Sequence, residues 1–328
     1  MTYLILGSNS FAGSSLVDYL LSRQEKVIGV NRSAQYHSVM QPYFNNPNKG
    51  AFTFFQLDIN RDLPEIIDVV RQHKPQYVID FAGQGMVAES WQSPEQWYAT
   101  NVVSKVKLHD YLRQCDFLER YVRVSTPEVY GNTERKVTED MHYNPSTPYA
   151  VSHAAIDMSL TTFYKQYQFP VCLTRFANFY GPHQQLYRII PRTIIYALTG
   201  NKLSLHGGGH SQRAFIHGHD VAAGIDKVIQ QGTLGDVYHF SSGQSITIRR
   251  LVERICELLE IDFSSLVTIT DDRPGKDAKY EMDATKAECQ LNWSPLYTLD
   301  EGLNHTIKWV KDNLKIITQL PLNYIHKE

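Results

Sequence analysis

The sequence has few cysteines and no long apolar run. Its four cysteines are widely scattered, with no CxxC spacing and no Cys/His cluster, so neither a zinc site nor a disulfide framework is expected. Scattered thiols of this kind favour a reducing, cytoplasmic location. No apolar run approaches the roughly 18 residues of a membrane span, and residues 1–6 lack the basic flank of a signal peptide. We therefore expect a cytoplasmic protein with neither a metal nor a membrane partner.

An excess of charge of either sign is also absent. The formal net charge is −2 over 328 residues, and there is no basic patch and no acidic tail. This balance argues against a nucleic-acid partner. An anionic small molecule would have to be bound by a few local cationic groups. The chain has no internal repeat and no low-complexity tract, and it is long enough for two lobes.

The first half of the chain alternates short apolar strands with amphipathic helices. The expected strands are 3–6, 26–30, 52–56, 77–81, 121–125 and 171–175, and the expected helices are 14–22, 63–72, 95–114 and 149–167. Such alternation predicts an α/β fold with a Rossmann-type doubly wound parallel sheet. We assign residues 1–175 to an NAD(P)-binding domain and 176–328 mainly to a smaller α/β substrate-binding lobe. Part of 214–242 is expected to return to the first domain.

A glycine-containing turn, from Gly7 to Gly13, follows the first expected strand and opens the first helix. Glycines at this place allow a tight turn, and they let a pyrophosphate approach the amide donors and the dipole of the helix N-terminus. Gly7, Ser10, Phe11 and Gly13 are therefore candidate cofactor-binding residues, with the small Ser10 at the middle position. The alternative is an ordinary strand–helix turn, but the place directly after the first strand favours a dinucleotide.

The second expected strand ends without the carboxylate that usually binds the ribose 2′-hydroxyl of NAD. Asn31, Arg32 and Ser33 stand there instead. A guanidinium pairs well with a 2′-phosphate, so this segment favours NADP over NAD as the cofactor. A solvated Arg32 in a surface loop is the plainer alternative.

Two further segments carry groups suited to acid–base chemistry. The segment 125–131 places Thr126 and Glu128 directly after an apolar strand, and Tyr149 and His153 lie four residues apart on one face of an expected helix. With the glycine turn, these segments resemble the extended short-chain dehydrogenase/reductase family, and within it the NAD(P)-dependent nucleotide-sugar epimerases and dehydratases. The resemblance is strongest to nucleotide-sugar 4,6-dehydratases of the dTDP-glucose type. That family has YxxxK, whereas here the lysine position holds His153.

The resemblance implies a role for each of these side chains. Tyr149 would remove the proton of the sugar 4-hydroxyl while hydride leaves carbon 4 for the nicotinamide, and Thr126 would hydrogen-bond the 4-oxygen. Glu128 would remove the proton at carbon 5. His153 would stand in for the lysine, so Tyr149 and His153 also count as cofactor-binding residues beside the nicotinamide ribose. The aspartate that protonates the departing 6-hydroxyl in the glucose enzymes is replaced by Pro127.

Replacement of lysine by histidine changes the charge beside the tyrosine. Free lysine titrates near ~10.4 and free histidine near ~6.5, so an imidazole is mostly neutral at pH 7 and supplies little field for a tyrosinate. Three outcomes are open from the sequence: His153 is charged through a neighbour, it orients a water or the ribose without charge, or turnover is slow. A mere helix-surface role is disfavoured because His153 occupies the lysine position.

The remaining resemblances assign binding residues along nearly the whole chain. They add Asp58, Ile59, Phe81, Ala82 and Gly83 to the cofactor site. The implied substrate-binding residues are Gln84, Met86, Thr126, Asn178, Ile190, Pro191, Arg213 and Arg273. They would contact a nucleotide-diphosphate sugar, with the two arginines on its diphosphate. A homodimer through the helices at 95–114 and 149–167 is also implied.

The motifs leave three functions open. The first is a nucleotide-sugar 4,6-dehydratase, favoured by Thr126, Glu128 and Tyr149. The second is a 4-epimerase or carbon-4 dehydrogenase, suggested by Pro127, because loss of a general acid costs roughly 10² to 10⁴ in rate. The third is a catalytically weakened sugar-nucleotide-binding subunit, suggested by His153. We expect the first.

Overall fold

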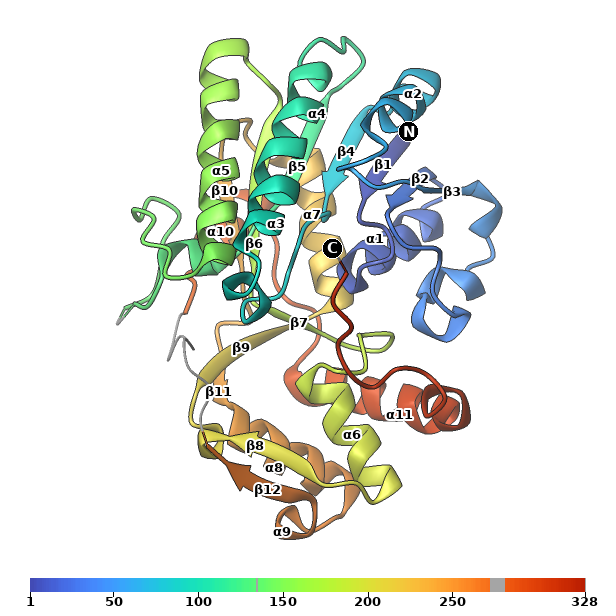
Figure 1. Cartoon of the computed structure of the whole chain (residues 1–328), viewed down its shortest axis with the longest axis vertical. Helices are drawn as coiled ribbons and strands as arrows, with labels where there is room; N and C mark the ends of the chain where they lie inside the picture. The colour runs from blue at the N-terminus through green and yellow to red at the C-terminus, as the bar shows by residue number, and fades with distance from the viewer. Residues whose placement is uncertain (134, 272–280, 328) are drawn as a thin grey trace.

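The computed structural model describes residues 1–133, 135–271 and 281–327. Figure 1 shows a large upper lobe, built on a twisted sheet with helices in front and behind, and a smaller lower lobe of helices and short strands. The predicted fold class, an α/β Rossmann-type parallel sheet with a smaller second lobe, is confirmed. In these ranges, no helix is both long enough and apolar enough to cross a membrane.

The large sheet has seven parallel strands in the order β3-β2-β1-β4-β5-β6-β10. The strands are β1 Thr2–Leu6, β2 Lys26–Asn31, β3 Phe52–Gln56, β4 Tyr77–Asp80, β5 Arg120–Val124, β6 Val171–Phe176 and β10 Val237–Phe240. The strands are apolar runs because both faces are covered: Leu4 and Leu6 pack on one side, and Tyr3 and Ile5 on the other. The strand order reverses at β1, where doubly wound sheets bind their ligands.

Helices cover both faces of this sheet. One face carries α1 Phe11–Ser22, α7 Gly218–Gln231 and α10 Thr285–Leu291; the other carries α2 Leu63–His73, α4 Lys105–Leu112 and α5 Pro148–Tyr167. Their apolar side chains form two separate buried clusters, one on each side of the sheet. Single-turn 3₁₀ helices lie at Ser38–Met40, Pro42–Asn45, Lys49–Ala51, Glu89–Trp91, Pro127–Tyr130 and Gly207–Gly209.

The smaller lobe is built on short strands and four helices. Its elements are β7 Asn178–Tyr180, α6 Ile189–Thr199, β8 Leu203–His206, β9 Gln212–His217, β11 Ser245–Thr247, α8 Ile248–Leu259, α9 Phe263–Leu266, β12 Val267–Thr270 and α11 Leu299–Ile317. Within 214–242, β10 pairs with β6 in the large sheet, whereas β9 lies between β7 and β11 in a three-stranded sheet. The lobe has its own core, which includes Ile194, Leu251 and Leu303.

The stretch expected as one helix at 95–114 is divided in three. It consists of α3 Pro94–Tyr98, a π-helix Ala99–Ser104, and α4. In the π-helix, the side-chain amide of Asn101 donates to the Gln84 carbonyl at 3.2 Å and to Ser152 Oγ at 3.0 Å, and its oxygen accepts from the Gln84 N–H at 2.9 Å. The widened turn therefore joins the loop after β4 to α5, which is a common use of π-turns near functional sites.

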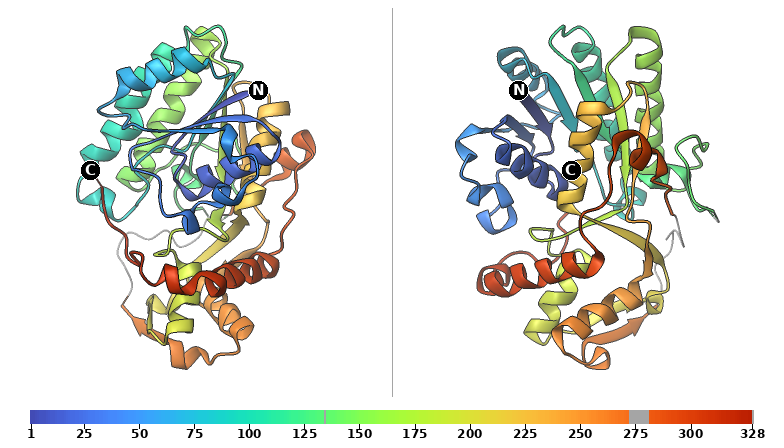
Figure 2. Two further views of the ribbon diagram at one scale, coloured as in Figure 1. Left: turned by 90° about the vertical axis from the view of Figure 1, so that its right-hand side faces the viewer. Right: turned by 180° about the vertical axis from the view of Figure 1, so that it is seen from behind.

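The chain after α11 turns back towards the large lobe. Figure 2 shows residues 318–327, here called the C-terminal tail, rising from α11 along the upper lobe. Arg192 of α6 donates to the Leu322 carbonyl at 2.9 Å, and the Gln84 side chain donates to the Lys327 carbonyl at 2.8 Å. The tail is thus bonded to both lobes.

Candidate active site

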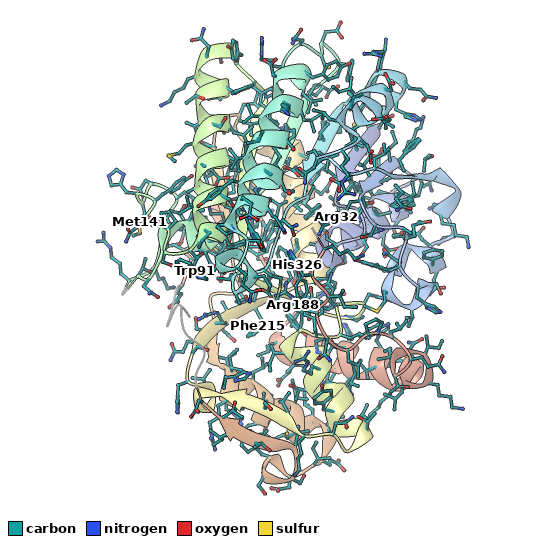
Figure 3. The ribbon with its side chains drawn as sticks, in the orientation of Figure 1. Arg32, Trp91, Met141, Arg188, Phe215 and His326 are labelled. Atoms are coloured by element: carbon teal, nitrogen blue, oxygen red, sulfur yellow. The ribbon has the colours of Figure 1, made fainter. Side chains whose placement is uncertain are left out.

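A cavity of about 520 Å³ lies at the carboxyl ends of β1, β2 and β4. Its walls come from the turn after β1, the loops after β2, β3 and β4, residues 185–188, and the C-terminal tail. The expected binding residues that line it are Gly7, Ser10, Asn31, Arg32, Ser33, Asp58, Ile59, Phe81, Ala82, Gly83, Gln84 and Met86. In Figure 3, Arg32, Arg188 and His326 are labelled close to where the two lobes meet.

The glycine turn packs closely against the loop after β4 and against α1. Gly7 has φ +82°, and a Cβ there would lie 2.8 Å from the backbone N of Ala82. A Cβ on Gly13 would overlap the Gly7 carbonyl, so helix and turn approach too closely for any side chain. Ser10 caps α1: its Oγ accepts from the Gly13 N–H at 3.0 Å. Phe11 does not line this cavity but a smaller one, of about 360 Å³.

The loop after β2 is fixed by a residue that the sequence did not single out. The side-chain amide of Asn9 donates to the carbonyls of Ser33 and Ala34, at 3.0 and 2.9 Å. Arg32 donates to Gln84 Oε1 at 3.4 Å. Ser33 Oγ accepts from Lys327 Nζ at 2.8 Å. Two cationic side chains, one of them from the tail, therefore stand at the end of β2 where a carboxylate is absent.

Thr126 and Glu128 lie where β5 gives way to a 3₁₀ helix. Thr126 is buried and caps that helix, with its Oγ1 accepting from the Glu128 N–H at 3.3 Å. Pro127 occupies the first helical position, where a missing N–H costs nothing. Tyr149 lies in the first turn of α5, which begins after the cap Thr147. The 3₁₀ helix and α5 pack against each other.

His153 lies one turn after Tyr149 on α5, and the centroids of their rings are 4.6 Å apart. The imidazole is 7% exposed, and its Nδ1 lies 3.1 Å from Nη2 of Arg123 on β5. Burial lowers the pKa of His153 well below its usual value, and the charges of Arg123, Lys105 and Arg175 lower it further. The ring is therefore neutral at pH 7. Of the three outcomes left open above, a charged imidazole is disfavoured.

Asp80, at the end of β4 and behind the imidazole, pairs with two cationic side chains. Its Oδ2 lies 2.6 Å from Lys105 Nζ and 3.2 Å from Arg123 Nη1, and it accepts from the Tyr121 hydroxyl at 2.8 Å. All four side chains are buried. Burial raises the pKa of Asp80, but the charges of Lys105 and Arg123 outweigh that effect and hold it below its usual value. Burial and the charge of Arg123 lower the pKa of Lys105 to about 7 against the opposing effect of Asp80.

Asp157 anchors the same face of α5 to the sheet. Its Oδ2 accepts from Ser125 Oγ at 2.6 Å and from Arg175 Nη2 at 2.7 Å. Tyr149, His153 and Asp157 follow one another at four-residue spacing, so they lie on one face of the helix. Arginines from β5 and β6 fix that face at two points, which places the first turn of α5 at the carboxyl end of the sheet.

The expected substrate-binding residues are spread over both lobes. Asn178 on β7 donates to the Ala214 carbonyl at 3.2 Å, which places it next to β9, the strand of Arg213. Ile190 and Pro191 are buried in the first turn of α6. Near them, residues 185–188 line the cavity. Arg273 lies outside the described residues.

Sequence reasoning missed Asp80, Lys105, Arg123 and the C-terminal tail. A signal was present for two of them: Asp80 ends an apolar strand, and Arg123 interrupts one, in Tyr-Val-Arg-Val. Charges in such strands are almost never buried unless they are paired, so partners could have been sought. The sequence of the tail has no periodic pattern of apolar residues from which its contacts could be predicted.

Comparison with known proteins supplies the family. The family model described as GDP-mannose 4,6 dehydratase matches residues 4–306. The chain belongs to this family. A curated relative, the dTDP-glucose 4,6-dehydratase of Haemophilus influenzae, is 30% identical over 333 residues, covering 94% of this chain and 97% of the relative. The dTDP-glucose 4,6-dehydratase of Streptomyces antibioticus is 33% identical over 321 residues, covering 95% and 93%.

Solved structures resemble this member of the 4,6-dehydratase family over almost its whole length. The dTDP-glucose 4,6-dehydratase from Streptomyces venezuelae, with NAD bound, has a TM-score of 0.89 and 29% identity, covering 96% of this chain and 98% of that one. The UDP-glucose 4-epimerase of Thermotoga maritima has a TM-score of 0.87 and 25% identity, covering 96% and 100%. The fold alone does not separate dehydration from epimerisation, so the reaction has to be argued from the site.

Proposed function

We propose that this protein is a nucleotide-sugar 4,6-dehydratase. The observation that carries the proposal is that Thr126 and Glu128 follow β5 in a 3₁₀ helix that packs against α5, the helix with Tyr149 in its first turn, at the same edge of the sheet as the cavity. The relatives named as dTDP-glucose 4,6-dehydratases, which cover more than nine tenths of the chain, support it.

Three side chains divide the proton transfers and hydrogen bonds of this reaction among them. Tyr149 takes the proton of the sugar 4-hydroxyl, and Thr126 hydrogen-bonds the 4-oxygen as it becomes a carbonyl. A nicotinamide dinucleotide held in the cavity beside Gly7, Ala82 and Gly83 would supply the hydride acceptor for carbon 4 and the hydride donor for carbon 6. Glu128 removes the proton from carbon 5. The 6-hydroxyl leaves as water, and with Pro127 in place of an acid, Glu128 itself delivers the proton that the leaving group needs. When hydride reaches carbon 6, carbon 5 takes up a proton from solvent, and Tyr149 releases to solvent the proton that it took from the 4-hydroxyl.

A nicotinamide dinucleotide suits the cavity, because Gly7 and Ser10 line it beside the N-terminus of α1, where amide donors and the helix dipole favour a pyrophosphate. Two structural neighbours bind NAD, those from Streptomyces venezuelae and Bacillus anthracis. Arg32 and Lys327 would suit the 2′-phosphate of NADP. Binding of both dinucleotides, compared directly in wild type and in Arg32→Gln, separates the two: selective loss of NADP binding identifies Arg32 as a 2′-phosphate ligand.

The substrate is a nucleotide-diphosphate sugar, with its diphosphate on Asn178, Arg213 and Arg273. The relatives' names favour a thymidine nucleotide, and the family description names a guanosine one. A basic side chain on the strand next to Asn178 suits phosphate geometry. We place the enzyme in the cytoplasm, since its four cysteines are free thiols, as a reducing compartment keeps them.

We also propose a homodimer through α5 and the segment from α3 to α4. Val103, Val151 and Met158 lie on these two adjoining segments and are 52%, 38% and 54% exposed, and apolar side chains exposed together on one surface favour a partner that covers them. Light scattering of the purified protein, compared with that of Met158→Glu, tests the surface: the variant should have half the mass of the wild type.

Pro127 favours a second candidate, a 4-epimerase or carbon-4 dehydrogenase. The structural similarity to the UDP-glucose 4-epimerase of Thermotoga maritima also supports this candidate. Neutral His153 favours a third, a subunit that binds sugar nucleotides with little turnover. Mass spectrometry of a panel of nucleotide sugars, incubated with the protein and NAD or NADP, distinguishes them. Loss of one water without net cofactor reduction supports the dehydratase. Unchanged mass with inverted stereochemistry, stoichiometric reduced cofactor, or tight binding without product would each overturn it.

A further inference from the structure

The hydrogen bond between Arg123 and His153 fixes the protonation of the imidazole. A guanidinium has five N–H donors and no acceptor, so Arg123 Nη2 can only donate across the 3.1 Å to His153 Nδ1. Nδ1 of His153 is therefore unprotonated and accepts this hydrogen bond. In a neutral ring the proton is then on Nε2, and a ring protonated at both nitrogens would point an N–H at the guanidinium.

Arg123 itself is fixed from the other side. Its Nη1 donates to Asp80 Oδ2 at 3.2 Å, and Asp80 also accepts from Lys105 at 2.6 Å. Arg123 is 1% exposed and Asp80 and Lys105 are fully buried, so none of the three can turn to solvent. The buried guanidinium therefore spans Asp80 and His153, with one terminal nitrogen on each.

We propose that Arg123 is a positioning residue of the reaction: through His153 it places a neutral Nε2–H donor beside Tyr149, and its own fixed charge supplies the positive field at the base. Position 153 holds no charged lysine; the positive charge is instead on Arg123 of β5, which contacts the imidazole from behind. This inference rests on the proposed function, because it assigns Tyr149 the role of base.

Other charged groups act on the same place and are part of the argument. They are Lys105 on α4, Asp80 on β4, Arg175 on β6 and Asp157 on α5. Asp157 pairs with Arg175 at 2.7 Å, and Asp80 faces both Lys105 and Arg123. With two carboxylates against three cationic side chains, the pocket behind His153 keeps an excess of positive charge while Lys105 is protonated.

The protonation state can be measured without any turnover. In protein labelled with ¹⁵N-histidine, long-range proton–nitrogen correlation spectra identify each tautomer, and His153→Asn identifies the signals of His153 by their loss. We expect the Nε2–H tautomer, with no protonation between pH 8 and pH 5.5. An Nδ1–H tautomer, or a ring that titrates near the ordinary value of ~6.5, would overturn the proposal. If the expected tautomer is found and no nucleotide sugar loses water, the proposed function fails and the arrangement of Arg123 and His153 stands.

The pH dependence of kcat tests whether the charge of Arg123 acts on Tyr149. Tyr149 acts as a base only when it is deprotonated, so activity rises with pH through its pKa, and loss of a nearby positive charge moves that rise to higher pH. Arg123→Gln should lower kcat roughly 10-fold and move the acid limb of the kcat profile up by about one pH unit. Arg123→Lys keeps the charge and should keep the limb near its wild-type position. Arg71→Gln, on an exposed arginine far from the site, should change neither.

A folded Arg123→Gln with an unmoved acid limb would overturn the proposal, because a merely structural role lowers kcat without moving the limb. The reciprocal exchange completes the test. His153→Lys alone places an ammonium beside Arg123 and should lose activity at least roughly 10-fold, since like charges at this distance oppose each other. In the double variant Arg123→Gln/His153→Lys, activity should exceed that of either single variant. A gain of activity in His153→Lys alone would show that Arg123 supplies no field.

Discussion

The imidazole of His326 lies flat on the indole of Trp97, with ring centroids 5.6 Å apart and planes only 3° apart. Its Nε2 lies 2.8 Å from Gln96 Oε1, and the next residue, Lys327, donates to Ser33 at 2.8 Å. The tail therefore connects α3 to the loop after β2 across the cavity. Because residues of the tail form part of the wall of the cavity, we expect the tail to contribute to the enclosure of a bound ligand.

Removal of the tail should raise the rate at which a bound dinucleotide dissociates. In a chain shortened after Leu320, we expect a bound dinucleotide to dissociate roughly ten-fold faster, which corresponds to about 1.4 kcal/mol of lost contacts. Stopped-flow displacement of bound NADH, followed by its fluorescence, measures the rate. Lys327→Ala should show part of the effect, and Lys311→Ala, on the exposed side of α11, should show none. Equal release rates in the shortened and full chains would contradict the enclosure.

Glu128→Gln should separate oxidation from elimination. Tyr149 and Thr126 remain, so carbon 4 is still oxidised, but the proton at carbon 5 has no base and the hydride cannot return to carbon 6. Reduced nicotinamide should therefore accumulate, visible by its near-ultraviolet absorbance, while product formation falls by roughly 10² or more. Tyr149→Phe is the matched control, because it blocks the first step and should accumulate no reduced cofactor. Full dehydration by Glu128→Gln would remove Glu128 from the mechanism.

Asp80→Asn should destabilise the protein strongly. The change leaves Lys105 and Arg123 buried without their shared anion, and breaking a buried ion pair in this way costs about 3–5 kcal/mol. The free energy of unfolding in urea measures it. Asp68→Asn removes the carboxylate of an exposed pair with Arg71 and should cost less than about 1 kcal/mol. Similar losses in the two variants would mean that the buried pair contributes no more than a surface pair.

Buried histidines should make the protein sensitive to acid. Burial lowers the pKa of His109 and of His239 to about 3. Below pH ~6.5 the unfolded chain binds protons that the folded chain does not, so their contribution is complete above that pH and is lost as pH falls towards 3. Each histidine adds about 1.4 kcal/mol per pH unit to the slope of unfolding free energy in this window.

Urea unfolding at steps from pH 7 to pH 5 measures that slope. His109→Gln should reduce it by the share of one histidine, because glutamine does not titrate. The exposed His142 serves as the control, and His142→Gln should leave the slope unchanged. A slope that His109→Gln does not alter would mean that His109 is protonated in the folded protein.

Local patterns were enough to predict the sheet and the tight turn after β1. Apolar runs alternate with helical periodicity because helices bury both faces of the sheet. Glycine at positions 7 and 13 indicates a close approach between backbone segments, which the structure has. The break in the helix at 95–114 was not predictable in the same way. No glycine or proline marks the π-helix; its stabilising contacts come from Gln84 and Ser152, which lie in other elements.

The state of His153 also depends on residues far away in the sequence. The sequence shows that a lysine is replaced, but whether the imidazole is charged depends on Arg123, thirty positions earlier, and on Asp80 behind it. Such pairings depend on strand register and burial, which a single sequence does not specify. Arg123 inside an apolar strand was the available hint, and it pointed to a partner without naming it.

The path of the tail has a practical consequence for protein engineering. Lys327 lines the cavity, so an affinity tag attached beyond the tail would begin beside the cavity wall. Met1 lies at the opposite end of β1, where its ammonium pairs with Glu25 at 2.7 Å. A tag at that end would give up one exposed ion pair and leave the cavity unobstructed, so activity assays and crystallisation trials should start from the protein tagged there.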